Sequence, residues 1–148
     1  MEKVDWTGTI NNVDRLSTIP NVVKGLKIKP NTCNEVSSEV DLSRFDHVRK
    51  IDVGSNAFQN VDHLTMNGLN KLTSFEMGVG SFNGAHGITI GANSLNAMSS
   101  VNLTTFSSID RVTIGENSMN EVSSVVASGL TNLTQFTVKK NSLIIATE

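Results

Sequence analysis

The sequence predicts a mainly β fold: a solenoid of about 24-residue coils whose short parallel strands form two sheets. The first observation is a set of four tripeptides of the form apolar-Thr-apolar, which begin at the evenly spaced positions 64, 88, 112 and 136. They are Leu64-Thr65-Met66, Ile88-Thr89-Ile90, Val112-Thr113-Ile114 and Phe136-Thr137-Val138. A fixed period of this length indicates one supersecondary unit stacked on itself, and the period-two alternation within each tripeptide indicates a strand.

The second observation is that similar apolar-x-apolar segments fall between these tripeptides. From residue 40 onward, the strand-like segments begin at 40, 51, 64, 75, 88, 101, 112, 125 and 136, so a shorter and a longer step recur. In stacked coils, equivalent strands become parallel neighbours about 4.8 Å apart. We therefore expect one sheet with strands at 26, 51, 75, 101 and 125, and a second with strands at 40, 64, 88, 112 and 136.

The third observation is that the two kinds of step differ in sequence. A 13-residue step opens with a turn and an apolar plug, as in Gly54-Ser55-Asn56-Ala57-Phe58, whereas an 11-residue step carries apolar residues three apart, as in Phe45, Val48 and Ile51. Gly and Asn suit the turn because both tolerate positive φ. We expect the turn asparagines to bond neighbouring coils, and Cys33, at a plug position, to be a small buried hydrophobe.

The alternation of steps breaks once, because two 13-residue steps follow each other between residues 75 and 101. In one interpretation, both sheets stay in register and the Asn-Ser turn changes sides of the solenoid at residue 88. In the other, residues 78–101 form an enlarged coil that loops outward. The 24-residue spacing of the threonine strands favours the first interpretation.

The chain is expected to form a single repeat domain over residues 1–148. Within it, 1–25 is a less regular first coil or an N-terminal cap, 26–143 contains the repeats, and 144–148 is a tail. No internal linker or low-complexity stretch interrupts the pattern.

The repeat unit, best represented by Val53-Gly54-Ser55-Asn56-Ala57-Phe58, resembles the leucine-rich repeat superfamily and is most similar to its BspA-like branch. The resemblance extends from about Leu26 to Leu143, although Val61 and Val122 stand where that branch usually has cysteine. It implies a scaffold for adhesion or protein interaction, of a kind often found on the surfaces of bacteria and protists. The fold itself does not specify a function.

Composition excludes several partners. A formal charge of −2 and scattered basic residues argue against nucleic acid or an anionic membrane as the main partner. No apolar run approaches membrane-spanning length, so membrane insertion is not expected. A single cysteine requires no oxidising compartment. We expect a cytoplasmic location if this is the full chain, and an extracellular or cell-surface one if it is a fragment.

Two columns of outward residues are the candidate binding surfaces. One contains Thr65, Thr89, Thr113 and Thr137, and the other contains Lys27, Asp52, Glu76 and Asn102, followed by Val126. The threonine column most simply stabilises its sheet, with an ice- or polysaccharide-binding surface as a minor alternative. The second column is most simply a solvated charged face; if that surface binds a partner, the adjacent carboxylates of Asp52 and Glu76 are the first candidates for recognition.

The sequence does not predict an enzyme, a cofactor or a metal site. Asp52 and Glu76 could begin an acid–base pair, but no catalytic companion accompanies them. His47, His63 and His86 have no metal-ligand spacing.

We therefore expect a non-enzymatic module that presents a rigid solenoid face to a protein partner. The alternative is a structural segment of a longer surface or adhesion protein. End-to-end self-association is a further expectation, because an uncapped solenoid end exposes apolar residues and strand edges.

Overall fold

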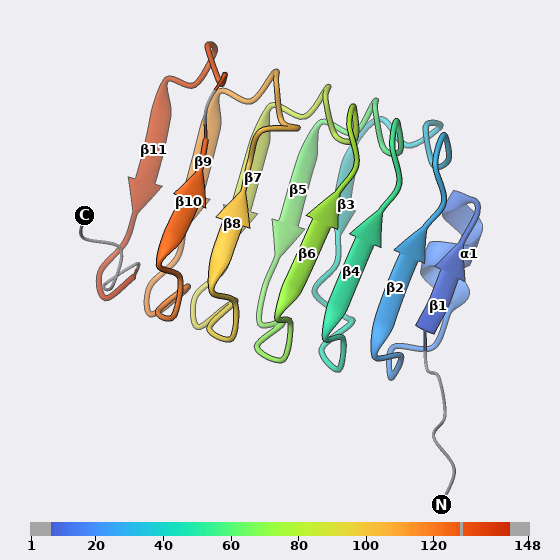
Figure 1. Ribbon diagram of the computed structural model, residues 1–148, viewed down its shortest axis with the longest axis horizontal. Helices are drawn as coiled ribbons and strands as arrows, with labels where there is room; N and C mark the ends of the chain where they lie inside the picture. The colour runs from blue at the N-terminus through green and yellow to red at the C-terminus, as the bar shows by residue number, and fades with distance from the viewer. Residues whose placement is uncertain (1–6, 128, 143–148) are drawn as a thin grey trace, which may run out of the picture.

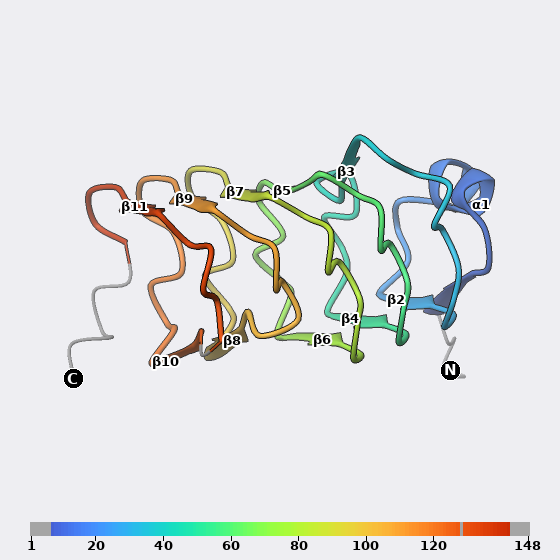
Figure 2. The ribbon, with the colours of Figure 1, turned by 90° about the horizontal axis from the view of Figure 1, so that it is seen from above.

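The structure, a computed structural model, describes residues 7–127 and 129–142. The chain winds into a solenoid whose coils carry short parallel strands on two opposite faces (Figures 1 and 2). The strands are β1 (Thr7–Ile10), β2 (Gly25–Ile28), β3 (Glu39–Asp41), β4 (Lys50–Val53), β5 (His63–Met66), β6 (Ser74–Met77), β7 (Gly87–Ile90), β8 (Ser100–Asn102), β9 (Arg111–Ile114), β10 (Ser124–Val126) and β11 (Gln135–Val138). The one described helix is α1 (Val13–Thr18).

One face is an unbroken five-stranded parallel sheet in the order β11-β9-β7-β5-β3, here called the threonine sheet. Its register places Thr65 beside Thr89, Thr89 beside Thr113, and Thr113 beside Thr137. The 24-residue spacing predicted from the sequence is therefore the spacing of hydrogen-bonded neighbours, and the predicted solenoid of parallel strands is confirmed.

The opposite face, here called the interrupted face, consists of two separate sheets. β1, β2, β4 and β6 form the first in that order, while β8 and β10 form the second. The regular coil length separates the paired residues Lys50 and Ser74, and again Ser100 and Ser124. The coil that leads from Ser74 to Ser100 is longer, and β6 does not pair with β8. The expected continuation of this sheet from residue 75 to residue 101 therefore does not occur.

The interruption coincides with a change of side of the Asn-Ser turn. The plug residue Phe82 stacks on Phe58, the plug of the preceding coil, with ring centroids 5.0 Å apart. Its other neighbour is Phe106, at 5.4 Å, which belongs to an 11-residue step rather than to a turn. On the opposite side, the N–H of the plug Leu95 donates to the carbonyl of Gly68, 3.0 Å away. The side change predicted by the first interpretation is confirmed, although only the threonine sheet stays in register.

The turns combine left-handed backbone with a buried plug. Asn56 and Phe58 have φ of 61° and 55°, and the later turns repeat this alternation. The other non-glycine residues with positive φ are Asn31, Cys33, Leu69, Phe82, Asn93, Leu95, Asn117, Met119 and Asn141. A left-handed conformation is costly for a bulky residue, so burial of the plug in the core must offset that cost. Phe58 is 1% exposed and Phe82 is 0% exposed.

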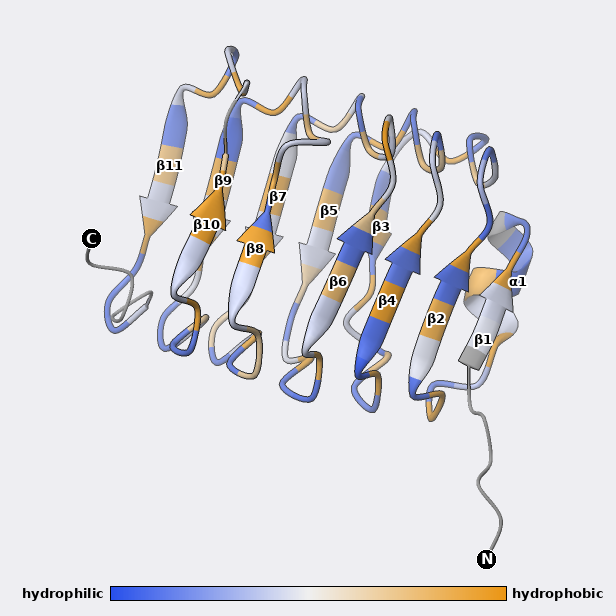
Figure 3. Cartoon of the chain, viewed as in Figure 1, coloured by the Kyte–Doolittle hydropathy of each residue, from blue (hydrophilic) through white to orange (hydrophobic). Residues whose placement is uncertain are grey.

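The core is a column of apolar side chains between the two faces. β2, β4 and β6 each carry inward apolar residues that flank an outward polar one, as their alternating bands in Figure 3 show. At the N-terminal end, the Oδ1 of Asn12 caps α1 by accepting from the N–H of Arg15 at 3.0 Å. Ile19, which follows the helix, packs so closely over Gly8 that a side chain there would overlap it.

Side-chain amides also join the coils, but not those of the turn asparagines. The Oδ1 atoms of Asn70 and Asn96 accept from backbone N–H groups one coil further on, at Asn96 and Asn120. The turn residue Asn56 instead contacts the next coil through its backbone N–H, which donates to the carbonyl of Val79 at 3.0 Å. The prediction that the turn amides bridge the coils thus assigned the role to the wrong asparagines.

Candidate functional site

The predicted charged column is a true ladder over its first three members. Lys27 of β2 is the register partner of Asp52 in β4, which in turn is the partner of Glu76 in β6. Lys27 and Glu76 are exposed and Asp52 is half-buried. Within the described part of the chain, neither carboxylate forms an ion pair with a Lys or Arg side chain. Two neighbouring negative charges therefore face solvent without a fixed counter-charge.

A shallow depression of about 360 Å³ lies where these three strands end. It is lined by Lys27, Asp52 and Glu76 together with the turn residues that follow the strands, among them Pro30 and Gly54. Close stacking of the coils requires glycine at the start of the turns after β4 and β6, at Gly54 and Gly78. A Cβ on Gly54 would lie 2.5 Å from the backbone nitrogen of Pro30, so a side chain there would push the coils apart.

The ladder ends at Glu76 because β6 has no strand partner on its far side. A cleft of about 310 Å³ occupies the interruption between β6 and β8. Its lining residues are Thr73, Ser74, Phe75, Glu76, Met77, Ser100, Asn102 and Thr105. Asn102, which the sequence placed beside Glu76 in one column, is instead across this cleft, and its register partner is Val126.

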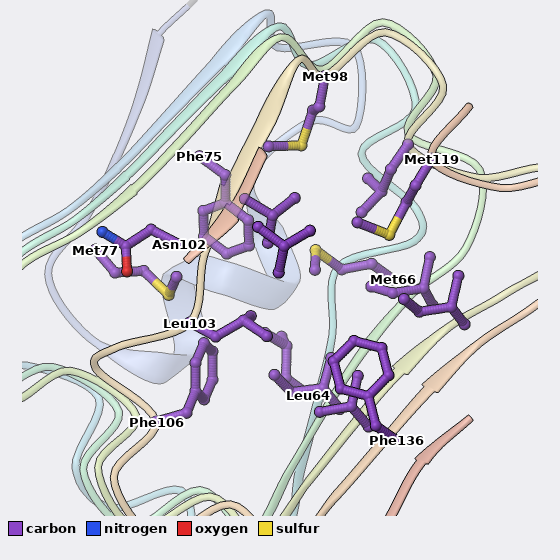
Figure 4. A pocket seen from close by; sticks show the side chains of 17 residues that line it. Leu64, Met66, Phe75, Met77, Met98, Asn102, Leu103, Phe106, Met119 and Phe136 are labelled. Carbon is purple, nitrogen blue, oxygen red and sulfur yellow. The ribbon is translucent and has the colours of Figure 1, made fainter. Parts of the chain in front are cut away.

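Beneath the cleft, the interruption leaves part of the apolar core incompletely covered. Phe75 and Met77 of β6 and Val101 of β8 point inward but are only half-buried, whereas Ile51 and Val53 of β4 are fully buried. Phe75, Met77 and Val101 line a small interior cavity of about 30 Å³ (Figure 4), and apart from Asn102 the side chains around it carry only carbon and sulfur. The hydroxyl of Thr105 lies 3.6 Å from the sulfur of Met77 and spans part of the opening.

The cleft and the depression share Glu76 and Met77, so they form one continuous surface. We call the surface formed by Lys27, Asp52, Glu76 and the lining of the cleft the acidic face. Among the described residues, Glu76 is the only ionisable one that lines the cleft. The cleft therefore combines a polar rim, one carboxylate and an apolar floor. Sequence periodicity identified its charged residues but not the cleft.

The threonine column lies on the opposite face, and two of its hydroxyls bond to the preceding coil. Thr65 donates to the carboxylate of Glu39 in the preceding coil, and the hydroxyl of Thr89 is 2.8 Å from Nε2 of His63. All four threonines are half-buried. These bonds join adjacent coils, so the geometry fits a structural role for the column.

The remaining titratable residues do not converge on a site. Within residues 7–127 and 129–142, no three His, Cys, Asp or Glu side chains lie where they could share a metal ion. His47 pairs with Asp46 at 2.9 Å, and His86 lies 3.5 Å from Asp110. Cys33 is 2% exposed, which confirms the buried plug, and its burial raises the pKa of the thiol. Burial and a raised pKa both make a thiol less reactive.

No protein-family model, curated protein or solved structure matches this chain. Among the described residues, there is no helix with the length and apolar character needed to cross a membrane.

Proposed function

We propose that this chain is a non-enzymatic protein-interaction module of the leucine-rich repeat type, closest to the BspA-like repeats, and that it binds its partner through the acidic face. The observation that carries the proposal is the interruption between β6 and β8. It places a cleft with an incompletely covered apolar floor directly beside the ladder of Lys27, Asp52 and Glu76. Binding surfaces of proteins typically combine a concave apolar centre with a few polar groups that fix orientation.

Rigidity of the surrounding coils supports this proposal. The residues of the acidic face lie on strands and tight turns, and the unbroken threonine sheet supports them from behind. A preformed surface has little conformational entropy to lose on binding, so more of the contact energy contributes to affinity.

The charge of the face indicates the chemistry of the partner. Asp52 and Glu76 are neighbours without fixed counter-ions, and a basic segment would relieve their mutual repulsion. Solvent-exposed charges attract over about 8 Å at physiological salt. Association should therefore become slower and weaker as salt is added.

The absence of a catalytic role is part of the proposal. Acid–base or nucleophilic catalysis needs a second reactive group within hydrogen-bond reach of the first. Among the described residues, Glu76 is the only ionisable one in the cleft lining, and the depression that Asp52 lines holds no ionisable residue besides Lys27, Asp52 and Glu76.

Affinity capture with the immobilised chain, followed by cross-linking, tests the proposal. The wild type is expected to retain a protein partner, and Asp52→Ala combined with Glu76→Ala should weaken capture at least about tenfold, as loss of a central contact does. The matched control is Glu116→Ala combined with Glu121→Ala, which removes the same charge from exposed positions around another turn. Capture that survives in the Asp52/Glu76 variant would show that the acidic face is not the binding surface.

A second candidate function, as a structural segment of a longer surface assembly, is favoured by the apolar side chains of β11. Phe136 and Val138 lie at inward positions of this strand, yet they are 40% and 41% exposed. Stacking against a further coil or a second copy would bury them. Sedimentation of the wild type and of Val138→Lys tests this candidate, because only the wild type should associate as its concentration rises.

A further inference from the structure

We propose that the cleft between β6 and β8 is a slot for a single arginine side chain of the partner protein. This inference rests on the proposed function and makes it more specific, since it names the group that enters the acidic face. It follows from the size of the cleft, the acceptors around it and the apolar floor beneath it.

The cleft opens where β6 and β8 lie visibly further apart than the paired strands of this face (Figure 1). Directly behind the interruption, β5, β7 and β9 remain hydrogen-bonded neighbours, so the coils stay joined behind the cleft. With a volume of about 310 Å³, the cleft can admit one long side chain.

The lining of the cleft offers hydrogen-bond acceptors and a negative charge. The carboxylate of Glu76 lies on one wall, and the hydroxyls of Ser74, Ser100 and Thr105 lie around the rim. Because β6 and β8 each lack a strand partner on the cleft side, backbone groups along both edges also face it. The Oδ1 of Asn102 is already occupied, since it accepts from the N–H and hydroxyl of Thr104 at 2.9 and 2.6 Å.

The floor of the cleft suits a cationic group with an apolar stem. Phe75 and Met77 are half-buried there and can cover the methylene groups of the entering side chain. Arginine fits better than lysine for two reasons. Its planar guanidinium offers five donors to the dispersed acceptors, and it is less strongly hydrated than an ammonium, so entering a partly apolar slot costs less.

The lysines of the two neighbouring strands leave the site open to a partner. Lys50 of β4 is the register partner of Ser74, but it does not line the cleft, and no ion pair with Glu76 exists within the described residues. Lys27 lies two strands away from Glu76 along the ladder.

The test is an NMR titration of the full chain with the tripeptide acetyl-Gly-Arg-Gly-amide. Saturable shifts are expected for the amides of residues 73–77 and 99–105. The same peptide with citrulline, which is neutral and nearly isosteric, should bind at least about fivefold more weakly, because charge-assisted hydrogen bonds are the stronger ones. Glu76→Gln should cause a comparable loss for the arginine peptide.

A matched pair of substitutions tests the location. Ser100→Trp fills the rim of the cleft and should abolish the localised shifts, whereas Ser124→Trp, at the register partner of Ser100 on β10 and likewise exposed, should leave them unchanged. Equal binding of the citrulline peptide, persistence of the shifts in Ser100→Trp, or no shift up to the solubility limit of the peptide would each overturn the proposal.

The outcomes also separate this inference from the proposed function. If Ser100→Trp captures the partner normally while the Asp52/Glu76 variant does not, the acidic face binds the partner but the slot is not used. If the arginine peptide shifts the cleft residues as expected while the Asp52/Glu76 variant still captures the partner, the slot exists but the proposed binding surface is wrong.

Discussion

The two faces of this solenoid are built from the same repeat, yet one is continuous and the other is divided. In the threonine sheet, every coil advances the register by the same amount, and the inward residues Ile88 and Ile90 of β7 are 3% and 5% exposed. On the interrupted face, the coil from Ser74 to Ser100 is longer than its neighbours, and the inward residues Phe75 and Val101 beside the gap are only half-buried.

The comparison shows that a coil can keep its place in one sheet while losing it in the other. When the Asn-Ser turn changes sides, two long steps meet at β7, and the additional length of chain is accommodated on the interrupted face, between β6 and β8. The threonine sheet holds the two halves together, as does the stack of Phe58, Phe82 and Phe106, which runs across the change. The cleft thus forms while the buried apolar residues on both sides of it remain in one core cluster.

The largest effect is expected from removing the aromatic ring that links the two halves. Phe82→Ala should lower the free energy of unfolding by about 4 kcal/mol, because a fully buried ring leaves a cavity in a tight stack. Phe75→Ala, beside the cleft, should lower the free energy of unfolding by only about 2 kcal/mol, since that ring is only partly buried. Urea denaturation measures both values, and equal losses would contradict the difference between the faces.

A smaller effect is expected from a matched pair of valines. Val112 of β9 is 2% exposed in the threonine sheet, while Val101 of β8 is half-buried on the interrupted face. We expect Val112→Ala to lower the free energy of unfolding by about 2 kcal/mol and Val101→Ala to lower it by about 1 kcal/mol, in proportion to the apolar area that each side chain buries. The same denaturation experiment applies, and a larger loss for Val101 would reverse the comparison.

Hydrogen exchange should show the missing pairing directly. β7 is bonded on both sides, whereas β8 is bonded only to β10. Cleft-side amides of β8 should exchange at least about tenfold faster than the amides of β7. This ratio corresponds to a difference of about 1.4 kcal/mol in the free energy of local opening. Exchange measured by NMR under native conditions gives both rates. Equal protection would mean that β6 and β8 pair in solution.

The smallest effect concerns the charges at the end of the ladder. Glu76→Gln should raise the free energy of unfolding by about 0.5 kcal/mol at low salt, because it removes the repulsion from Asp52 across the strand pair. The gain should fade as salt screens the charges. Glu121→Gln is the control, since Glu121 is exposed and lies outside the strands. A loss of stability in Glu76→Gln would indicate that a cation is held between the carboxylates.

Much of this arrangement could be predicted from residue spacing. The register of the four threonine strands, the ladder of Lys27, Asp52 and Glu76, and the burial of Cys33 all follow from a constant coil length and a strand period of two. The prediction failed at Asn102 because it extended a column across the longer coil, where the strands no longer pair. Spacing could locate that irregularity, but it could not show which of the two faces would lose its pairing.

The sequence by itself determined the solenoid, the inward and outward positions of its strands, and the place where its repeat is broken. These are local properties, since they depend on the hydrophobic period and on turn residues that accept positive φ. Only the tertiary structure decided that the break opens between β6 and β8. Closing that gap would require shifts in the threonine sheet and in the stack of Phe58, Phe82 and Phe106, because both link the same coils. The cleft is therefore a consequence of packing among distant residues, which no single segment encodes.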